Sequence, residues 1–184
     1  MNSFLSLIGR AIFFITGWKF IPLPSYFGAK HVIIGFPHTS NVDTVRAFTG
    51  FKIAKIKGHV LIKKELFFFP MSNFFKMMGG IPVDRSSKGG VVDQMAQEFE
   101  NRDSFYLSIV PEGTRKNTTS IKTGFWYIAK KADVSIILWY LDNENKVTRW
   151  LGEIKPTDID HDLQTIKELY DKAGYSISIG NSNN

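Results

Sequence analysis

The sequence predicts a single α/β domain in which a mixed central sheet is flanked by helices. Apolar, β-branched runs alternate with amphipathic segments along the chain, as in proteins whose strands are joined by helices. A length of 184 residues suits one domain with a sizeable core. No internal repeat or low-complexity linker divides the chain. We therefore expect one sheet and one main core.

The first element is an expected amphipathic helix over residues 3–18. Its apolar face is wide and aromatic, and Arg10 and Lys19 are its only cations. This pattern is typical of a helix lying in a membrane interface, and equally of a helix packed on its own domain. Pro22 and Pro24 then end the element. The expected organisation is a helix and connector over residues 1–24, at a membrane surface, followed by a domain over residues 25–180.

The rest of the pattern defines the elements of that domain. The helices are expected at 41–55, 89–101, 122–132 and 162–173. Strands are expected at 32–36, 59–62, 81–83, 105–110, 135–141 and 147–154.

Composition narrows the class of partner. The formal charge of +6 and the pI of about 9.4 favour an anionic partner such as nucleic acid, a phosphorylated metabolite or a membrane surface. Six cations and no acid lie between residues 44 and 64, as expected of a solvated face or of a surface that steers anions. The absence of cysteine excludes disulfides and thiolate catalysis.

Hydropathy limits how the chain can meet a membrane. The longest apolar run near the N-terminus, residues 11–18, is far shorter than the ~20 residues of a spanning helix. The first nine residues hold no Lys or Arg, unlike a secretory signal. We expect a protein that is either cytosolic or attached peripherally to a membrane surface.

Residues 66–78 contain five Phe and three Met in thirteen positions. Core packing explains many stretches of this kind. Flexible Met beside flat aromatic rings also suits a hydrophobic channel for a long, variable chain or a surface that faces a membrane. We favour the channel or membrane-facing role over core packing.

The most informative stretch runs from Val32 to Asp43. A buried strand is expected to end at Phe36-Pro37, a turn to expose His38, and a helix to begin near Ser40. On one helix His38 and Asp43 would lie roughly 140° apart, so they can meet only across a turn. A carboxylate that holds one imidazole nitrogen fixes the tautomer and orientation, and such a histidine can take a proton from a hydroxyl. The alternatives are a partly exposed histidine and a capping box in which Asp43 only stabilises the helix start.

Three apolar strands end in polar clusters: His38 to Asp43, Asp84-Arg85, and residues 112–115. In open α/β sheets ligands bind at the carboxyl ends of strands, so these clusters could share one cleft. Arginines favour phosphate through bidentate hydrogen bonds. A phosphate ester with a free hydroxyl would suit such a site.

The three clusters, in this order, resemble motifs of the lysophosphatidic acid acyltransferases (1-acylglycerol-3-phosphate acyltransferases) of the glycerolipid acyltransferase superfamily. The matching segments are His38-Thr39-Ser40-Asn41-Val42-Asp43, Gly80-Ile81-Pro82-Val83-Asp84-Arg85 and Pro111-Glu112-Gly113-Thr114-Arg115. The resemblance covers residues 38–115. It implies a glycerolipid acyltransferase-like fold and an acyltransferase domain within residues 25–180.

The resemblance also implies a reaction. His38, oriented by Asp43, would be the general base for a lysophospholipid hydroxyl, most simply that of lysophosphatidic acid, which attacks an acyl thioester. Acyl-CoA or acyl-carrier protein would be the co-substrate, with no other cofactor and no metal. The substrate-binding residues implied are Arg85, Glu112, Gly113, Thr114 and Arg115. Residues 66–78 would line or approach the acyl channel.

Two features depart from the family. Its fourth block, a Val-Pro-Ile-like strand associated with the acyl donor, reads Val134-Ser135-Ile136 here. The chain also lacks the longer hydrophobic N-terminus of many members. These departures leave the donor, the acyl length and the lysolipid acceptor open.

Other classes fit less well. A non-catalytic lipid-binding protein on the same fold has no need of an oriented base. A nucleic-acid binder is not expected, because the aromatic residues cluster in apolar runs and no binding motif is present. A serine hydrolase would need a G-x-S-x-G elbow, which is missing. The four histidines show no metal-ligand spacing.

Overall fold

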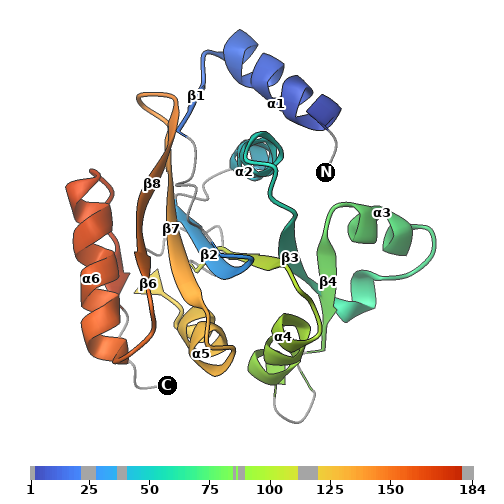
Figure 1. Ribbon diagram of the computed structural model, residues 1–184, viewed down its shortest axis with the longest axis vertical. Helices are drawn as coiled ribbons and strands as arrows, with labels where there is room; N and C mark the ends of the chain where they lie inside the picture. The colour runs from blue at the N-terminus through green and yellow to red at the C-terminus, as the bar shows by residue number, and fades with distance from the viewer. Residues whose placement is uncertain are drawn as a thin grey trace.

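The computed structural model describes residues 3–21, 28–36, 41–84, 86, 90–111 and 120–179. Within these ranges the fold is a seven-stranded sheet with helices on both faces and a small two-stranded sheet, β6 (Ser120–Ile121) with β9 (Ser178–Ile179) (Figure 1). The helices are α1 (Ser3–Thr16), α2 (Asn41–Ile53), α3 (Met71–Met77), α4 (Gly90–Glu100), α5 (Gly124–Lys131) and α6 (Ile159–Lys172), with a short 3-10 turn, η1 (Lys64–Leu66). The large sheet has the order β1-β8-β7-β2-β5-β3-β4. Its strands are β1 (Lys19–Phe20), β2 (Lys30–Phe36), β3 (Gly58–Lys63), β4 (Gly80–Val83), β5 (Phe105–Ile109), β7 (Ser135–Asp142) and β8 (Val147–Ile154).

The sheet is mixed, as predicted. Strands β7, β2, β5, β3 and β4 pair in parallel, whereas β8 runs antiparallel to β7. Parallel strands connected by helices are buried on both faces, so they are apolar throughout rather than at alternate positions. Strand β2 shows this, because Val32, Ile33 and Ile34 are all buried.

Alternation along the strands divides the core into two sides. Val32, Ile34 and Phe36 face the large cluster that includes residues of α4, α5 and α6, while Ile33 faces Phe51 of α2. Figure 1 shows the corresponding layers, with α1 and α2 over one face and α4, α5 and α6 over the other.

Helix α1 packs on its own domain and also leaves an apolar side exposed. Phe13 is buried in a cluster with Trp18, Ile53 and Leu141, so the helix packs on its own domain. The opposite side is apolar and exposed, and Phe14 reaches 86% exposure. The exposed apolar residues of this region are Leu7, Ile8, Ile12, Phe14, Ile15 and Ile21. Among the described residues, no helix combines the length and the apolar character needed to cross a bilayer.

Residues 64–78, which we call the Phe/Met arm, connect β3 to β4 and contain η1 and α3. The arm projects beyond the β4 edge of the sheet (Figure 1). Neither η1 nor α3 has a buried residue. The core-packing interpretation of this stretch is therefore wrong.

The predicted elements are confirmed with shifts of a few residues at their ends. The helix expected at 162–173 begins earlier, at Ile159, because Asp158 accepts a hydrogen bond from the His161 amide and caps it. The strand at 147–154 has the predicted bounds. Strands β1, β6 and β9 were not predicted; each has two residues, too few to show any periodicity. The connector at 22–24 and the cap at Ser40 lie outside the described residues.

Candidate active site

The three strands that lead into the sequence motifs end at one edge of the sheet. Paired residues of four parallel strands form a row across the sheet: Ile33 of β2, Ser108 of β5, Val60 of β3 and Gly80 of β4. Three residues beyond this row, the motif-bearing strands reach Phe36, Pro111 and Val83, where their polar segments begin. The three strand ends therefore lie at one edge, as a shared cleft would require, and the cleft itself stays a prediction. That edge is the carboxyl edge, where open α/β sheets bind ligands.

The first motif lies between a strand and a helix, as predicted. Strand β2 ends at Phe36 and α2 begins at Asn41, so Asp43 lies in the first turn of the helix. Its side chain is only 1% exposed. A buried carboxylate requires compensating partners.

Arg46 supplies one of these partners from the next turn of α2. Its Nη1 lies 2.9 Å from Asp43 Oδ1 and 2.9 Å from Asn143 Oδ1 in the turn between β7 and β8. The guanidinium also lies over the ring of Trp18, with Cζ 4.5 Å from the ring centroid. Arg46 is therefore a fixed part of the frame around Asp43 rather than a mobile surface cation.

The second motif is held by a side chain of α4. The amide of Asp84, the residue after β4, donates to Gln94 Oε1 at 3.1 Å, and Gln94 Nε2 donates to Asp84 O at 2.7 Å. The Asp84 carboxylate accepts hydrogen bonds from Ser86 N and Oγ, which hold the pKa of Asp84 below its ordinary value of 3.8. The backbone at the end of β4 is thus fixed immediately before Arg85.

The segment that contains the third motif is held at both of its described ends. Pro111, two residues after the end of β5, is buried, and its carbonyl oxygen accepts a hydrogen bond from Lys122 N at 2.9 Å. The chain therefore leaves the sheet edge at Pro111 and returns to it beside β6. The two ends of this connection are held together whatever the path between them.

Of the predicted site residues, the structure describes only Asp43. His38, Arg85, Glu112, Gly113, Thr114 and Arg115 lie outside the described residues. The strands that precede these positions, β2, β4 and β5, are described, and they end at one edge of the sheet. Contacts among the motif side chains stay a prediction.

Comparison with known proteins decides the family. The sequence profile of the family described as Acyltransferase matches residues 22–140, which include all three motifs. The chain belongs to the acyltransferase family. This confirms the resemblance drawn from the motifs. No protein of curated function matches this acyltransferase significantly.

The fold of the acyltransferase is also that of a solved relative. It is similar to the crystal structure of the 1-acyl-sn-glycerophosphate (LPA) acyltransferase PlsC from Thermotoga maritima, with a TM-score of 0.62 and 15% sequence identity. The similarity covers 95% of this chain and 80% of that one. At this identity the match establishes the fold, and the predicted architecture is confirmed.

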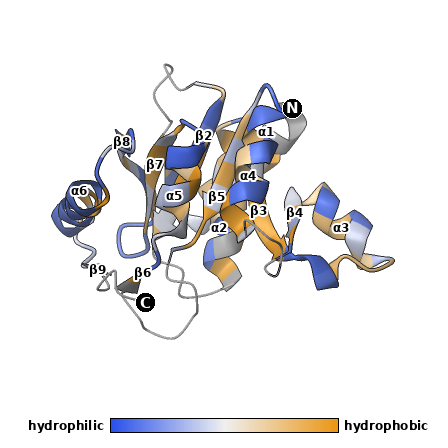
Figure 2. Ribbon diagram, turned by 90° about the horizontal axis from the view of Figure 1, so that it is seen from below, coloured by the Kyte–Doolittle hydropathy of each residue, from blue (hydrophilic) through white to orange (hydrophobic). Residues whose placement is uncertain are grey.

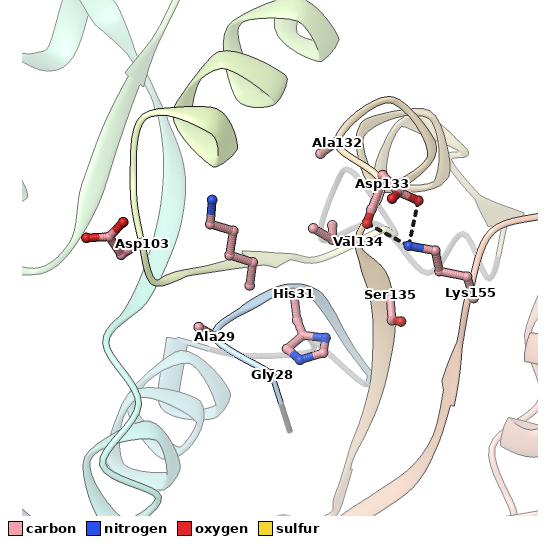
Figure 3. A pocket seen from close by; sticks show the side chains of 10 residues that line it. Gly28, Ala29, His31, Asp103, Ala132, Asp133, Val134, Ser135 and Lys155 are labelled. Atoms are coloured by element: carbon pink, nitrogen blue, oxygen red, sulfur yellow. Dashed lines mark hydrogen bonds and ion pairs between the residues drawn. The ribbon is translucent and has the colours of Figure 1, made fainter. Parts of the chain in front are cut away.

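A pocket of about 440 Å³ lies at the opposite edge of the acyltransferase sheet, around the starts of β2 and β7 (Figure 3). Its cations are already engaged within the fold. Lys155 Nζ lies 2.6 Å from Asp133 Oδ1, and Lys30 Nζ donates to Phe99 O at 2.6 Å. Burial lowers the pKa of His31 in this pocket below its ordinary value of 6.5. These features describe a polar end of the sheet and not a second reaction site.

The fourth sequence block lies at this same opposite edge. Val134 and Ser135 line the pocket, and Ser135 is the first residue of β7. Ser135 pairs with His31 at the start of β2, whereas the motif follows the far end of that strand. The serine that replaces the family's proline is therefore remote from the carboxyl edge.

Three residues of the site frame were not singled out from the sequence. Arg46 was counted only as one of six neighbouring cations, although its spacing of three from Asp43 is the signal of a helical ion pair. Gln94 and Asn143 reach their partners across the fold, so no local pattern indicates them.

Proposed function

We propose that this acyltransferase moves a fatty acyl group from an acyl thioester to the free hydroxyl of a lysophospholipid, with lysophosphatidic acid as the acceptor. The observation that carries the proposal is the convergence of three motif-bearing strands on one edge, beside a buried Asp43 fixed by Arg46. The comparison enzyme is an LPA acyltransferase on the same fold.

The proposed reaction is a direct transfer. His38, oriented by Asp43, takes the proton from the acceptor hydroxyl. The oxygen forms an ester bond to the acyl carbon as the bond from that carbon to the thioester sulfur breaks, and His38 returns the proton to the leaving thiolate. The step needs no acyl-enzyme, no metal and no cofactor beyond the co-substrate, acyl-CoA or acyl-carrier protein.

The acceptor phosphate is assigned to the second and third motifs. Arg85 and Arg115 would bind its oxygens, with Glu112, Gly113 and Thr114 around the glycerol. The fixed backbone at Asp84 and the clamped ends at Pro111 and Lys122 support this assignment, because an arginine positions a phosphate only if its own backbone is held.

The acceptor is a membrane lipid, and we assign the attachment to α1. The exposed apolar side of this helix, with Phe14 and Ile15 both more than 80% exposed, suits a helix lying in the bilayer interface. Residues 1–24 would then form the membrane-surface element and residues 25–180 the acyltransferase domain. The attachment would be peripheral, at the cytoplasmic face.

The test is acyl transfer from labelled acyl-CoA, and from acyl-carrier protein, to lyso-acceptors with and without phosphate. Turnover of lysophosphatidic acid that is lost in His38→Ala supports both the reaction and the base. Turnover of another lysolipid alone changes the acceptor and keeps the mechanism. Vesicle binding without transfer to any acceptor favours a non-catalytic lipid-binding protein. In Arg85→Ala and in Arg115→Ala, we expect KM for the phosphate-bearing acceptor to rise far more than KM for the acyl donor. If KM for the donor rises instead, these arginines bind the donor and not the acceptor.

A further inference from the structure

The Phe/Met arm holds its aromatic side chains in two distinct sets. Phe67 and Phe75 are half-buried and contact each other, with ring centroids 5.6 Å apart. Phe75 also lies against the sheet edge, where its backbone oxygen is close to Gly80. These inner contacts give the arm a defined shape and attach it to β4.

The outer set faces solvent. Phe69 is 86% exposed and Met77 is 74% exposed, values unusual for large apolar side chains in a folded domain. Met77 and Met78, the last residue and the C-cap of α3, stand three and four residues after Phe74, so the three side chains lie on one side of the helix end. The whole outer set is Leu66, Phe68, Phe69, Phe74, Met77 and Met78. Figure 2 shows hydrophobic colouring on the loop at the outer end of the arm, and hydrophobic and hydrophilic segments alternating on α3.

Charge around the outer set identifies the kind of partner. Lys63, Lys64 and Lys76 are exposed at the base of the arm and on α3; Glu65 is the only acid within residues 63–78, and Asp84 beyond them pairs with Lys64. Apolar side chains projecting beyond exposed lysines suit a bilayer with anionic headgroups, because the rings enter the acyl region while the ammonium groups stay with the phosphates.

The position of the arm places this contact beside the reaction edge. The arm leaves the sheet at the carboxyl end of β3, and Lys64 Nζ lies 3.5 Å from Asp84 Oδ2, one residue before Arg85. A membrane touched by the arm would therefore lie next to the second motif.

We propose that the Phe/Met arm is a membrane-inserting wedge for anionic bilayers, separate from α1, whose outer residues enter lipid rather than line an enclosed acyl channel. The inference does not depend on the reaction. Contact with lipid is measured directly, without turnover.

The absence of cysteine makes a site-specific test possible, since Phe69→Cys introduces a unique thiol for an environment-sensitive fluorophore. The control is Tyr127→Cys, an exposed position on α5, which covers the face of the sheet opposite to α1 and α2. With vesicles of phosphatidylcholine and phosphatidylglycerol, the probe at position 69 shifts to the blue and the control does not. A bound protein whose position-69 probe does not shift overturns the proposal, because another surface then makes the contact. No vesicle binding at all also overturns it.

Affinity gives a second readout. Phe68→Ser/Phe69→Ser should weaken partitioning onto these vesicles on the order of 10- to 100-fold, from the apolar area withdrawn from lipid. Tyr127→Ser should leave partitioning unchanged. Lys63→Gln/Lys76→Gln should weaken binding to anionic but not to pure phosphatidylcholine vesicles, with the difference lost at high salt.

The channel alternative has its own signature. If the arm instead lines an acyl channel, Phe68→Ser/Phe69→Ser alters the preferred acyl length with detergent-dispersed substrates and leaves vesicle partitioning intact. That result overturns the proposal. Inactivity of every form toward every acceptor would disprove the proposed reaction and leave the vesicle results standing.

Discussion

Replacing Arg46 by Ala removes the guanidinium that forms an ion pair with the buried carboxylate of Asp43. Breaking a fully buried ion pair costs about 3–5 kcal/mol. Here the Asp43 side chain is 1% exposed but that of Arg46 is 30% exposed, so water can reach the site and reduce the loss. The contact of the guanidinium with Trp18 adds roughly 0.5–1 kcal/mol. We expect Arg46→Ala to lower the free energy of unfolding by about 2–4 kcal/mol, which for a chain of this size lowers Tm by roughly 5–15 °C.

The assay combines urea unfolding with steady-state kinetics. Arg46→Lys keeps the charge but has a single ammonium for Asp43 and Asn143, so it should fall between wild type and Arg46→Ala. Lys172→Ala, at an exposed position of α6, is the control and should stay within about 0.5 kcal/mol of wild type. If Asp43 orients the base, Arg46→Ala also lowers kcat more than it raises KM. A variant with wild-type stability and kcat would refute the reasoning.

Three further perturbations test other parts of the frame. Gln94→Ala removes both hydrogen bonds to the backbone of Asp84, so KM for a phosphate-bearing acceptor should rise about tenfold with the donor KM unchanged; equal changes in both would contradict the assignment. Gly79→Ala should cost roughly 2 kcal/mol or more in urea unfolding, because Gly79 has φ +82° and a Cβ there would lie 2.5 Å from Gly58 O; a neutral effect would show that the arm's base can shift. Burial lowers the pKa of His59 from its ordinary 6.5, so the unfolded chain takes up a proton first and stability falls as pH drops through 6.5 toward the folded pKa; His59→Gln should reduce this fall, and an unchanged pH profile would contradict the argument.

The long elements of the fold were predictable because each carries its own signal. The apolar run of β2 and the helical spacing of Leu163, Ile166 and Tyr170 each indicate one structure, and burial agrees. Strand β1 could not be predicted, because its two residues become a strand only by pairing with Val147 and Thr148 far along the chain. The arm was ambiguous for a related reason: its composition is that of a core, and only the fold shows that η1 and α3 have no buried residue.

Each of the three motifs is a contiguous segment, so the sequence could indicate the residue types of the candidate site and their order. The structure adds the common register of β2, β5 and β4, which brings the three strand ends to one edge, and the contacts of the motif side chains stay a prediction. The side chains that hold the frame, Arg46, Gln94 and Asn143, needed the structure because two of them act across the fold.

The pairing of β1 with β8 affects the order in which the protein can form during synthesis. Lys19 N donates to Lys146 O, and Lys146 Nζ lies 3.4 Å from Thr16 O, a contact that spans 130 residues. The end of α1 thus acquires its last partners only after β7 and β8 have left the ribosome. Until then Phe13 and Trp18 lack Leu141, one of the residues with which they are buried, although Ile53 of α2 is already available to them. The apolar surface of α1 in the growing chain is therefore larger than that of the helix in the finished fold.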